Sequence, residues 1–333
     1  MSPIEIPREK WSGAVREVTL GATGDGGTRT STITVGGEAA LPFLQFEGAM
    51  PRRPVVAAEV VDAYPEDWSP ALLAAWGDEA RDPGAWAAKA VAAGAELIAL
   101  KLRGCHPDQG DHGPAEAVAA AKAVLGAVGV PLIVYGPGVA DKDNEVLVAV
   151  ADATKGERLA LANCTDKNYR TIVAGALGNG HVVVGQSPID VNLAKQLNIL
   201  ISDMGLGLER VLLDPTTGAL GYGIEYSYSV MERLRLAALT GDTMTQQPMI
   251  CTVGEESWRQ KESRSPDGVP QEWGDFTTRA VLWEISTAVT LLQSGADIIV
   301  LRHPTAIDHV KRAVDELMTG GVPEALAVSS PTV

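Results

Sequence analysis

Polar side chains with the potential for chemistry gather where short apolar runs of this 333-residue chain end. They are mostly amides, hydroxyls and glycines, types that bind a ligand by hydrogen bonds rather than attack it. The segments concerned are Asp62, Arg103–Asp108, Tyr135, Asn163–Asn168, Gln186–Asp190, Asp214–Gly223, Thr252–Glu256 and Arg302–Thr305. We therefore expect a binding face with little covalent chemistry of its own.

Three reaction classes that need a dedicated side chain find little support in these segments. A Schiff-base enzyme needs a lysine inside the site, and within the expected strands only Lys101 qualifies. A metal hydrolase needs clustered ligands, but there is no HxH motif and only His106 and His303 lie near strand ends. Hydrogen bonding is the expected role of both histidines. No GxSxG motif indicates a nucleophilic serine.

The three cysteines, Cys105, Cys164 and Cys251, lie far apart and form no CxxC pair. An iron-sulfur cluster takes four thiolates, so this chain cannot supply a full set. Each cysteine follows or ends an apolar run, where packing as a small apolar side chain is the expected role.

Eight apolar runs, each followed by an Ala-rich segment of helical period, are expected to position these residues. Such strict alternation predicts a parallel sheet, and eight units without a GxGxxG turn favour a closed (β/α)8 barrel of the TIM type. The expected strands are 55–63, 96–102, 131–136, 158–163, 181–186, 210–215, 248–254 and 297–304. The expected helices are 82–93, 114–128, 143–152, 166–177, 188–204, 225–239, 275–294 and 304–318. Ser187 is expected to cap the helix that begins at Pro188.

Three further segments lie outside the minimal barrel. Residues 1–54 are expected to form an extension in which 28–35 alternates as a hairpin strand and caps one barrel end; the barrel spans 55–320, and 321–333 form a tail. A long loop after the seventh barrel strand, 254–274, carries Trp258 and Trp273. These tryptophans are expected either to anchor a partner or to fold back on the barrel.

Structural interpretations compete with the functional ones. For each of Asp62, Asn163 and Asp214 the structural interpretation is favoured, because such side chains commonly cap helices and bind loop amides. The glycines of 214–223 could simply permit a tight loop. For that glycine- and threonine-rich loop, close approach of a large flat ligand is the favoured interpretation.

The composition is 46% hydrophobic and 21% charged, with a formal net charge of −15. This charge argues against nucleic acid and anionic membrane surfaces, which both select clustered lysine and arginine. The first residues lack the apolar core of a secretory signal, so a cytoplasmic location is expected.

Several long motifs in the sequence resemble those of a known protein family. They are HPD at 106–108, DKNYRT at 166–171, GQSPIDVNLAKQLNIL from Gly185, DPTTGALGYGIEYSYSVMERLRLAAL from Asp214, PMICTVGEESW from Pro248 and ADIIVLRHP from Ala296. Together these strings closely resemble the small subunit of the corrinoid iron-sulfur protein, also called the delta subunit of acetyl-CoA decarbonylase/synthase. The resemblance runs from about Gly21 to about Val310.

The resemblance implies a barrel that covers one face of cobalamin and forms a heterodimer with a large subunit, which bears the iron-sulfur cluster. A methyl group would pass over the corrinoid cobalt from a methyltetrahydrofolate methyltransferase to acetyl-CoA synthase. The chain has no DxHxxG motif, so it is not expected to give cobalt a histidine ligand. From strand-end position, the residues expected to meet the cofactor are His106, Asn163, Asp166, Gln186, Ser187, Asp214, Thr216, Thr217, Gly218, Gly221, Tyr222, Thr252, Gly254 and His303.

Two other functions remain open. In the first, the barrel is itself a pterin-dependent methyltransferase, with Asp62, Asn163 and Asp214 binding the pterin. In the second, it is a scaffold whose mouth only docks proteins. The expected carrier role makes the chain a non-catalytic part of a methyl-transferring complex.

Overall fold

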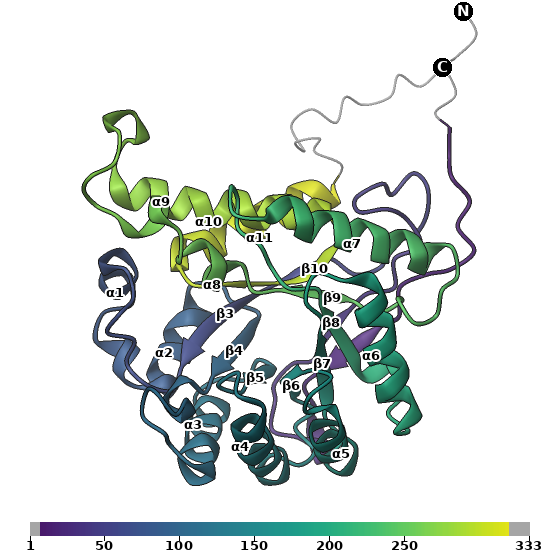
Figure 1. The fold of residues 1–333 in the computed structure, drawn as a ribbon, viewed down its shortest axis with the longest axis horizontal. Helices are drawn as coiled ribbons and strands as arrows, with labels where there is room; N and C mark the ends of the chain where they lie inside the picture. Colours follow the sequence, from purple (N-terminus) through teal and green to yellow (C-terminus); the bar gives the residue numbers. More distant parts are fainter. Residues whose placement is uncertain (1–6, 320–333) are drawn as a thin grey trace, which may run out of the picture.

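Eight parallel strands close into a barrel in this computed structural model, which describes residues 7–319 (Figure 1). The strands are β3 (Val55–Val61), β4 (Leu97–Lys101), β5 (Leu132–Tyr135), β6 (Ala160–Cys164), β7 (Val182–Gln186), β8 (Val211–Asp214), β9 (Met249–Cys251) and β10 (Ala296–Leu301). They neighbour one another in chain order, and β10 pairs with β3 to close the ring. The predicted (β/α)8 barrel is confirmed.

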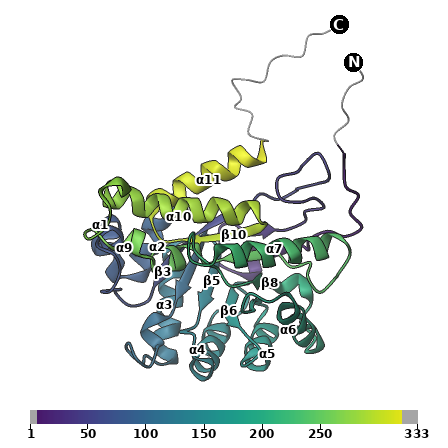
Figure 2. The ribbon, with the colours of Figure 1, turned by 45° about the horizontal axis from the view of Figure 1, so that its top comes forward.

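A layer of helices surrounds the strands, as the alternating pattern predicts (Figure 2). One main helix follows each strand: α2 (Pro83–Ala92), α3 (Pro114–Ala127), α4 (Ala140–Ala153), α5 (Tyr169–Asn179), α6 (Val191–Asp203), α7 (Ile224–Leu239), α10 (Phe276–Gln293) and α11 (Pro304–Met318). Most of the apolar core lies between this layer and the outward face of the strands. None of the helices within 7–319 is long and apolar enough to cross a membrane.

The helix start expected at Pro188 is wrong. The helix α6 begins at Val191, and Asp190 caps it, because its carboxylate accepts the amides of Asn192 and Leu193 at 2.7 and 3.0 Å. Ser187 instead belongs to a tight turn in which the Ile189 amide donates to the Ser187 carbonyl at 3.0 Å. The cap therefore lies three residues beyond the predicted position.

The amino-terminal hairpin is confirmed but shorter than the alternation suggests. Strand β1 (Val18–Leu20) pairs with β2 (Ile33–Val35) antiparallel. Val18, Leu20 and Val35 belong to the buried cluster inside the barrel, so the hairpin completes the interior core. It does so at the amino ends of the strands, where Arg158, just before β6, donates to the Thr19 carbonyl at 2.7 Å. The opposite, carboxyl ends stay open for the site.

Two segments beside the mouth are more helical than predicted. After β3 the chain forms α1 (Pro70–Trp76) and a 3-10 turn (Gly77–Arg81). The long segment after β9 contains α8 (Val253–Ser257) and α9 (Lys261–Arg264). Trp258 follows α8 and is 3% exposed, so this side chain folds back on the barrel. The predicted tail 321–333 lies outside the described residues, and the predicted domain boundaries stay predictions.

Candidate functional site

One side of the barrel mouth is a network of buried charges, which we call the ionic half: Glu59, Lys101, Glu255 and Arg302. Glu59 points inward from β3 and is fully buried. Arg302, just after β10, donates to Glu59 Oε1 through Nε at 2.9 Å and Nη2 at 2.6 Å. Lys101 Nζ lies 3.5 Å from Glu59 Oε2 and also contacts Glu255. Each charge therefore faces an opposite one.

These ion pairs determine how the network ionises. Burial alone lowers the pKa of Lys101, but the carboxylates of Glu59 and Glu255 outweigh it, and the pKa rises above its usual value. Burial acts to raise the pKa of Glu255, yet Lys101, Arg302 and Arg259 lower it to about 2. Lys101 is thus an ammonium at neutral pH. An ammonium has no lone pair for attack, so Schiff-base chemistry finds no support here.

A cavity of about 400 Å³ opens beside this network. It is lined by five cationic side chains and three carboxylates: Lys101, Arg103, Arg259, Arg264 and Arg302, with Glu59, Asp67 and Glu255. Trp68 forms part of its wall, and the Arg302 guanidinium lies 4.4 Å from the centre of that ring. The cavity is therefore cationic within a chain of net charge −15.

The other side of the mouth, at the ends of β6, β7 and β8, carries amides and hydroxyls. We call it the amide–hydroxyl half: Asn163, Gln186, Ser187, Asp214, Thr216 and Thr217. Gln186 Nε2 donates to Asp214 Oδ2 at 3.1 Å, and the Thr216 amide donates to Oδ1 at 2.8 Å. The Thr216 hydroxyl donates to the Ser187 carbonyl at 2.8 Å, and Thr217 Oγ1 accepts the Thr252 amide at 2.9 Å.

Asp214 is the one carboxyl of this half and is fully buried. Burial raises its pKa to about 6, although the bonds from Thr216 and Gln186 act in the opposite direction. The carboxyl thus serves the structural role favoured from the sequence, binding the Thr216 amide of the following loop. Asp62 does the same, because its Oδ1 accepts the Gly104 amide at 2.7 Å.

Four buried polar atoms of the mouth have no hydrogen-bond partner within residues 7–319. One is Glu59 Oε2, which the Lys101 ammonium still faces at 3.5 Å. The other three are neutral: Tyr135 Oη, Asn163 Oδ1 and Ser187 Oγ. These three neutral atoms lie at the ends of β5 and β6 and just after β7. A buried polar atom without a partner costs about 1–3 kcal/mol. At this open face these atoms are free to form hydrogen bonds with a ligand.

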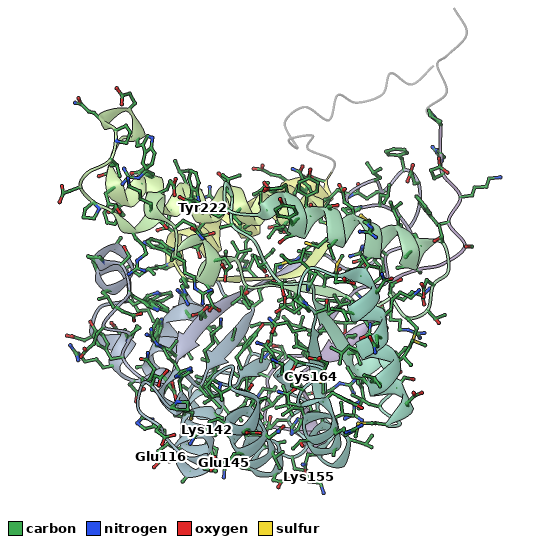
Figure 3. All side chains as sticks on the ribbon, viewed as in Figure 1. Glu116, Lys142, Glu145, Lys155, Cys164 and Tyr222 are labelled. Atoms are coloured by element: carbon green, nitrogen blue, oxygen red, sulfur yellow. The ribbon has the colours of Figure 1, made fainter. Side chains whose placement is uncertain are left out.

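The predicted site residues are not all equivalent in the structure. His106 and Asn163 line the cavity, whereas the network above joins Gln186, Ser187, Asp214, Thr216, Thr217 and Thr252. Asp166 is exposed, and Gly221 and Tyr222 lie exposed at the rim. Figure 3 shows Tyr222 at the outer edge near the start of α7, and Cys164 within the ring of helices.

Gly218 and Gly254 are sites of close approach within the protein. A Cβ on Gly218 would lie 2.5 Å from the Gly223 carbonyl oxygen, and one on Gly254 would lie 2.6 Å from the Arg302 amide. These glycines therefore allow two segments of the chain to pack closely together. This packing alone accounts for a glycine at each position.

His303 does not face the mouth as a free base. Its Nδ1 accepts the Thr305 amide at 3.1 Å, which caps α11, and its ring stacks on Trp258 at 5.9 Å. Burial lowers its pKa to about 4, so the ring is neutral at pH 7. The fully buried Glu284 of α10 holds this corner by accepting the amides of Arg302 and His303 and the Trp258 indole.

Glu59 is a mouth residue that was not predicted from the sequence. It stands alone as a charge within the apolar run VVAAEVV, all of which is buried. Glutamate is rarely buried without a partner, so that run was itself a signal that cations approach it. The cysteines follow the prediction: all three are buried, and burial raises the pKa of Cys105 and Cys164 to about 12.

Comparisons with known proteins place the sequence more narrowly than the fold does. Residues 17–312 match the family described as the CO dehydrogenase/acetyl-CoA synthase delta subunit. The chain is 37% identical over 325 residues to the acetyl-CoA decarbonylase/synthase complex subunit delta of Archaeoglobus fulgidus, covering 95% of this chain and 72% of that protein. The Methanopyrus kandleri subunit is 38% identical, with 93% and 77% covered.

Solved structures similar to this barrel include dihydropteroate synthases. The Yersinia pestis enzyme, in a sulfonamide drug complex, superposes with a TM-score of 0.56 at 17% identity, covering 82% of this chain and 97% of that one. The Xanthomonas albilineans enzyme with 4-aminobenzoic acid gives 0.56 at 15% identity, with 85% and 99% covered. At such low identity the likeness establishes the fold alone.

Proposed function

We propose, from the premise that this chain belongs to the CO dehydrogenase/acetyl-CoA synthase delta subunit family, that it is the small subunit of a corrinoid iron-sulfur protein. Its barrel mouth would cover one face of a cobalamin held with a large subunit, which would bear the iron-sulfur cluster. The methyl group would come from a methyltetrahydrofolate methyltransferase and leave to acetyl-CoA synthase. The chain is then a non-catalytic wall of the carrier.

The observation that carries this proposal is the set of unpartnered buried atoms Tyr135 Oη, Asn163 Oδ1 and Ser187 Oγ. A corrin ring is bordered by side-chain amides, which donate and accept hydrogen bonds, so these atoms suit such a ligand in kind. When bound, the corrinoid supplies the cobalt chemistry of methyl transfer. The chain's own part is to orient the ring edge and exclude water.

The remaining mouth residues suit a binding role. The Asp214 carboxylate fixes Gln186 and the Thr216 amide, so the loop that follows β8 is held in place before any ligand arrives. Lys101 is held as an ammonium by two carboxylates, and His303 is occupied as a helix cap. No mouth residue among these is poised as a nucleophile.

Metal content of the purified complex tests this function. The chain is co-expressed with the large subunit of its organism, and cobalt, iron and the visible absorbance spectrum are measured per heterodimer. Asn163→Leu replaces one unpartnered acceptor by an apolar side chain with the same number of heavy atoms. Thr216→Trp places a large ring in the loop that follows β8. Because one such contact contributes about 1–3 kcal/mol, we expect corrinoid affinity to fall roughly 5- to 150-fold for Asn163→Leu.

Asn192→Leu on the exposed start of α6 is the matched control and should keep full cobalt. A heterodimer that keeps its cobalt with both mouth changes would instead support a scaffold that only docks proteins.

The alternative, a pterin-dependent methyltransferase, is supported only by the shared fold with enzymes of low identity. Titration of the chain alone with methyltetrahydrofolate separates the two. The carrier proposal expects no saturable binding, whereas binding together with methyl transfer to free cobalamin would overturn it.

A further inference from the structure

The charges around the cavity beside the ionic half do not balance. Its wall carries five cationic side chains, Lys101, Arg103, Arg259, Arg264 and Arg302. In the part of the chain that the structure describes, four of them face carboxylates at salt-bridge distance, and these acids are Glu59, Asp67, Glu255 and Glu256. Five cations against four carboxylates leave one positive charge in excess. A ligand with a single negative charge would make the balance even.

The excess charge lies on Arg264, in α9. This side chain forms no ion pair among residues 7–319, and its Nη2 donates to the main-chain carbonyl of Asp67 at 3.5 Å. Arg103 Nη1 pairs with the Asp67 carboxylate at 2.7 Å. Two arginines of the cavity wall therefore meet at one acid. A planar guanidinium presents two parallel N–H donors, a geometry that matches a carboxylate.

The backbone is fixed on both sides of Arg264, although the side chain itself is exposed. Ser263 is fully buried, and its carbonyl accepts the hydroxyl of Ser69, just before α1, at 3.3 Å. On the other side, Arg279 Nη2 donates to the Ser265 carbonyl at 2.8 Å. Figure 1 shows α9 on the same side of the barrel as α1. Because this backbone is already ordered, binding a ligand costs Arg264 little beyond the freedom of its own side chain.

Apolar and aromatic side chains also line the cavity. They are Val61, Trp68, Leu72, Tyr135, Pro137 and Trp258. The volume of about 400 Å³ lies within the range of roughly 300–1,000 Å³ that pockets for small organic ligands occupy. An inorganic ion would leave most of this volume unfilled. The wall therefore suits a ligand with a compact apolar or aromatic body and a charged group at one end.

We propose that this cavity binds an organic monocarboxylate with a compact apolar body, and that Arg264 holds its carboxylate. The single excess charge favours a monoanion over a phosphate monoester, which carries a charge of about −1.5 to −2 at neutral pH. The site goes beyond the proposed function and does not depend on it, because neither Arg103 nor Arg264 belongs to the amide–hydroxyl half.

Calorimetric titration of the full chain at neutral pH tests the site with three probes of similar shape. Benzoate carries the carboxylate, benzamide is its neutral counterpart, and phenyl phosphate carries more charge. We expect saturable binding of one benzoate per chain. Benzamide should bind at least about 10-fold more weakly, because a hydrogen bond to a charged group contributes more than one to a neutral group.

Two changes of Arg264 locate the carboxylate. Arg264→Gln keeps a donor but removes the charge, so the affinity for benzoate should fall about 10- to 100-fold. Arg264→Lys keeps the charge without the planar donor pair, and its affinity should lie between the two. Arg312→Gln removes an exposed arginine of α11 outside the cavity wall, so this matched control should bind benzoate normally. Circular dichroism melts should match the unchanged chain, since both arginines are exposed.

The possible results decide between the site and its alternatives. Equal binding of benzoate and benzamide, or no saturable binding of any probe, would overturn the site. An Arg264→Gln chain that binds benzoate as tightly as the unchanged chain would overturn the role of Arg264. Tighter binding of phenyl phosphate than of benzoate would overturn the monocarboxylate in favour of a phosphate ester. None of these results changes the cobalt content of the heterodimer, so the proposed function is tested separately.

Discussion

The two halves of the barrel mouth satisfy their polar groups in opposite ways. In the ionic half, Glu59, Lys101, Glu255 and Arg302 neutralise one another across β3, β4, α8 and the end of β10. In the amide–hydroxyl half, hydrogen bonds fix Gln186, Asp214 and Thr216, yet Asn163 Oδ1 and Ser187 Oγ find no partner among the residues that the structure describes. Every charge of the first half faces an opposite charge within residues 7–319, whereas the second half leaves neutral polar atoms unpaired there.

This difference separates stability from binding in the mouth. Buried charges need a partner inside the protein at all times, because an unpaired charge in the interior is strongly destabilising. Neutral amides and hydroxyls cost less when unpaired, so the fold can leave them open for a ligand. We therefore expect changes in the ionic half to lower stability first, and changes in the amide–hydroxyl half to lower ligand content first.

Glu59→Leu should cause the largest loss of stability among these variants. It leaves Lys101 and Arg302 facing an apolar side chain, and removing one partner of a buried ion pair costs about 3–5 kcal/mol. Chemical denaturation followed by circular dichroism measures the free energy of unfolding. Thr217→Val in the other half is the reference, because it loses one hydrogen bond worth about 1–3 kcal/mol. Equal losses for the two variants would show that the halves do not differ as argued.

Asp214→Asn should change how stability depends on pH. Burial raises the pKa of Asp214 to about 6 from an ordinary 3.8, so above pH 6 the folded chain holds a carboxylate that prefers to be protonated. This group therefore costs about 3 kcal/mol of stability above pH 6, a cost that fades as the pH falls toward 4. The side-chain oxygen of the introduced asparagine still accepts the Thr216 amide. Its NH2 group donates to the Gln186 side-chain oxygen once the Gln186 amide is flipped.

The gain in stability of Asp214→Asn over the wild type should thus be largest at pH 7 and vanish near pH 4. Unfolding curves from pH 4 to 7 measure it. The buried Asp143 and Glu284, whose pKa values burial raises to about 6 and about 7, are present in both proteins and drop out of the difference. Parallel pH curves for the two proteins would show that Asp214 has the same pKa folded and unfolded.

Periodicity was enough to predict the barrel, because each parallel strand is an almost unbroken apolar run followed by a helix. The exceptions were local. The Ser187–Pro188 pair has the composition of a helix start, but the tight turn at Ile189 moves the start to Val191. Helix α8 begins at Val253, where the expected strand still continued, since a strand of three residues gives little pattern to read.

The position of the strand-end residues at the mouth was predictable, but their hydrogen-bond and ion-pair partners were not. Strand-end placement brought His106, Asn163, Gln186, Thr216 and Thr217 to one face, as a barrel requires. Which residues pair there depends on contacts between strands far apart in the chain. Glu59 and Arg302 are separated by 243 positions, and the spacing of one sequence does not reveal such a pair.

His303→Asn is expected to have the smallest effect on stability. The sequence predicted that His303 meets the cofactor. Its ring caps α11 and stacks on Trp258, so it belongs with the ionic half and its structural role. Asparagine can cap a helix equally well, and losing the stacked ring should cost only about 0.5–1.5 kcal/mol at pH 7.5. Cobalt per heterodimer should stay at the wild-type value. If the cobalt content falls while the free energy of unfolding changes this little, His303 contacts the ligand directly. It would then belong to the ligand-binding half of the mouth.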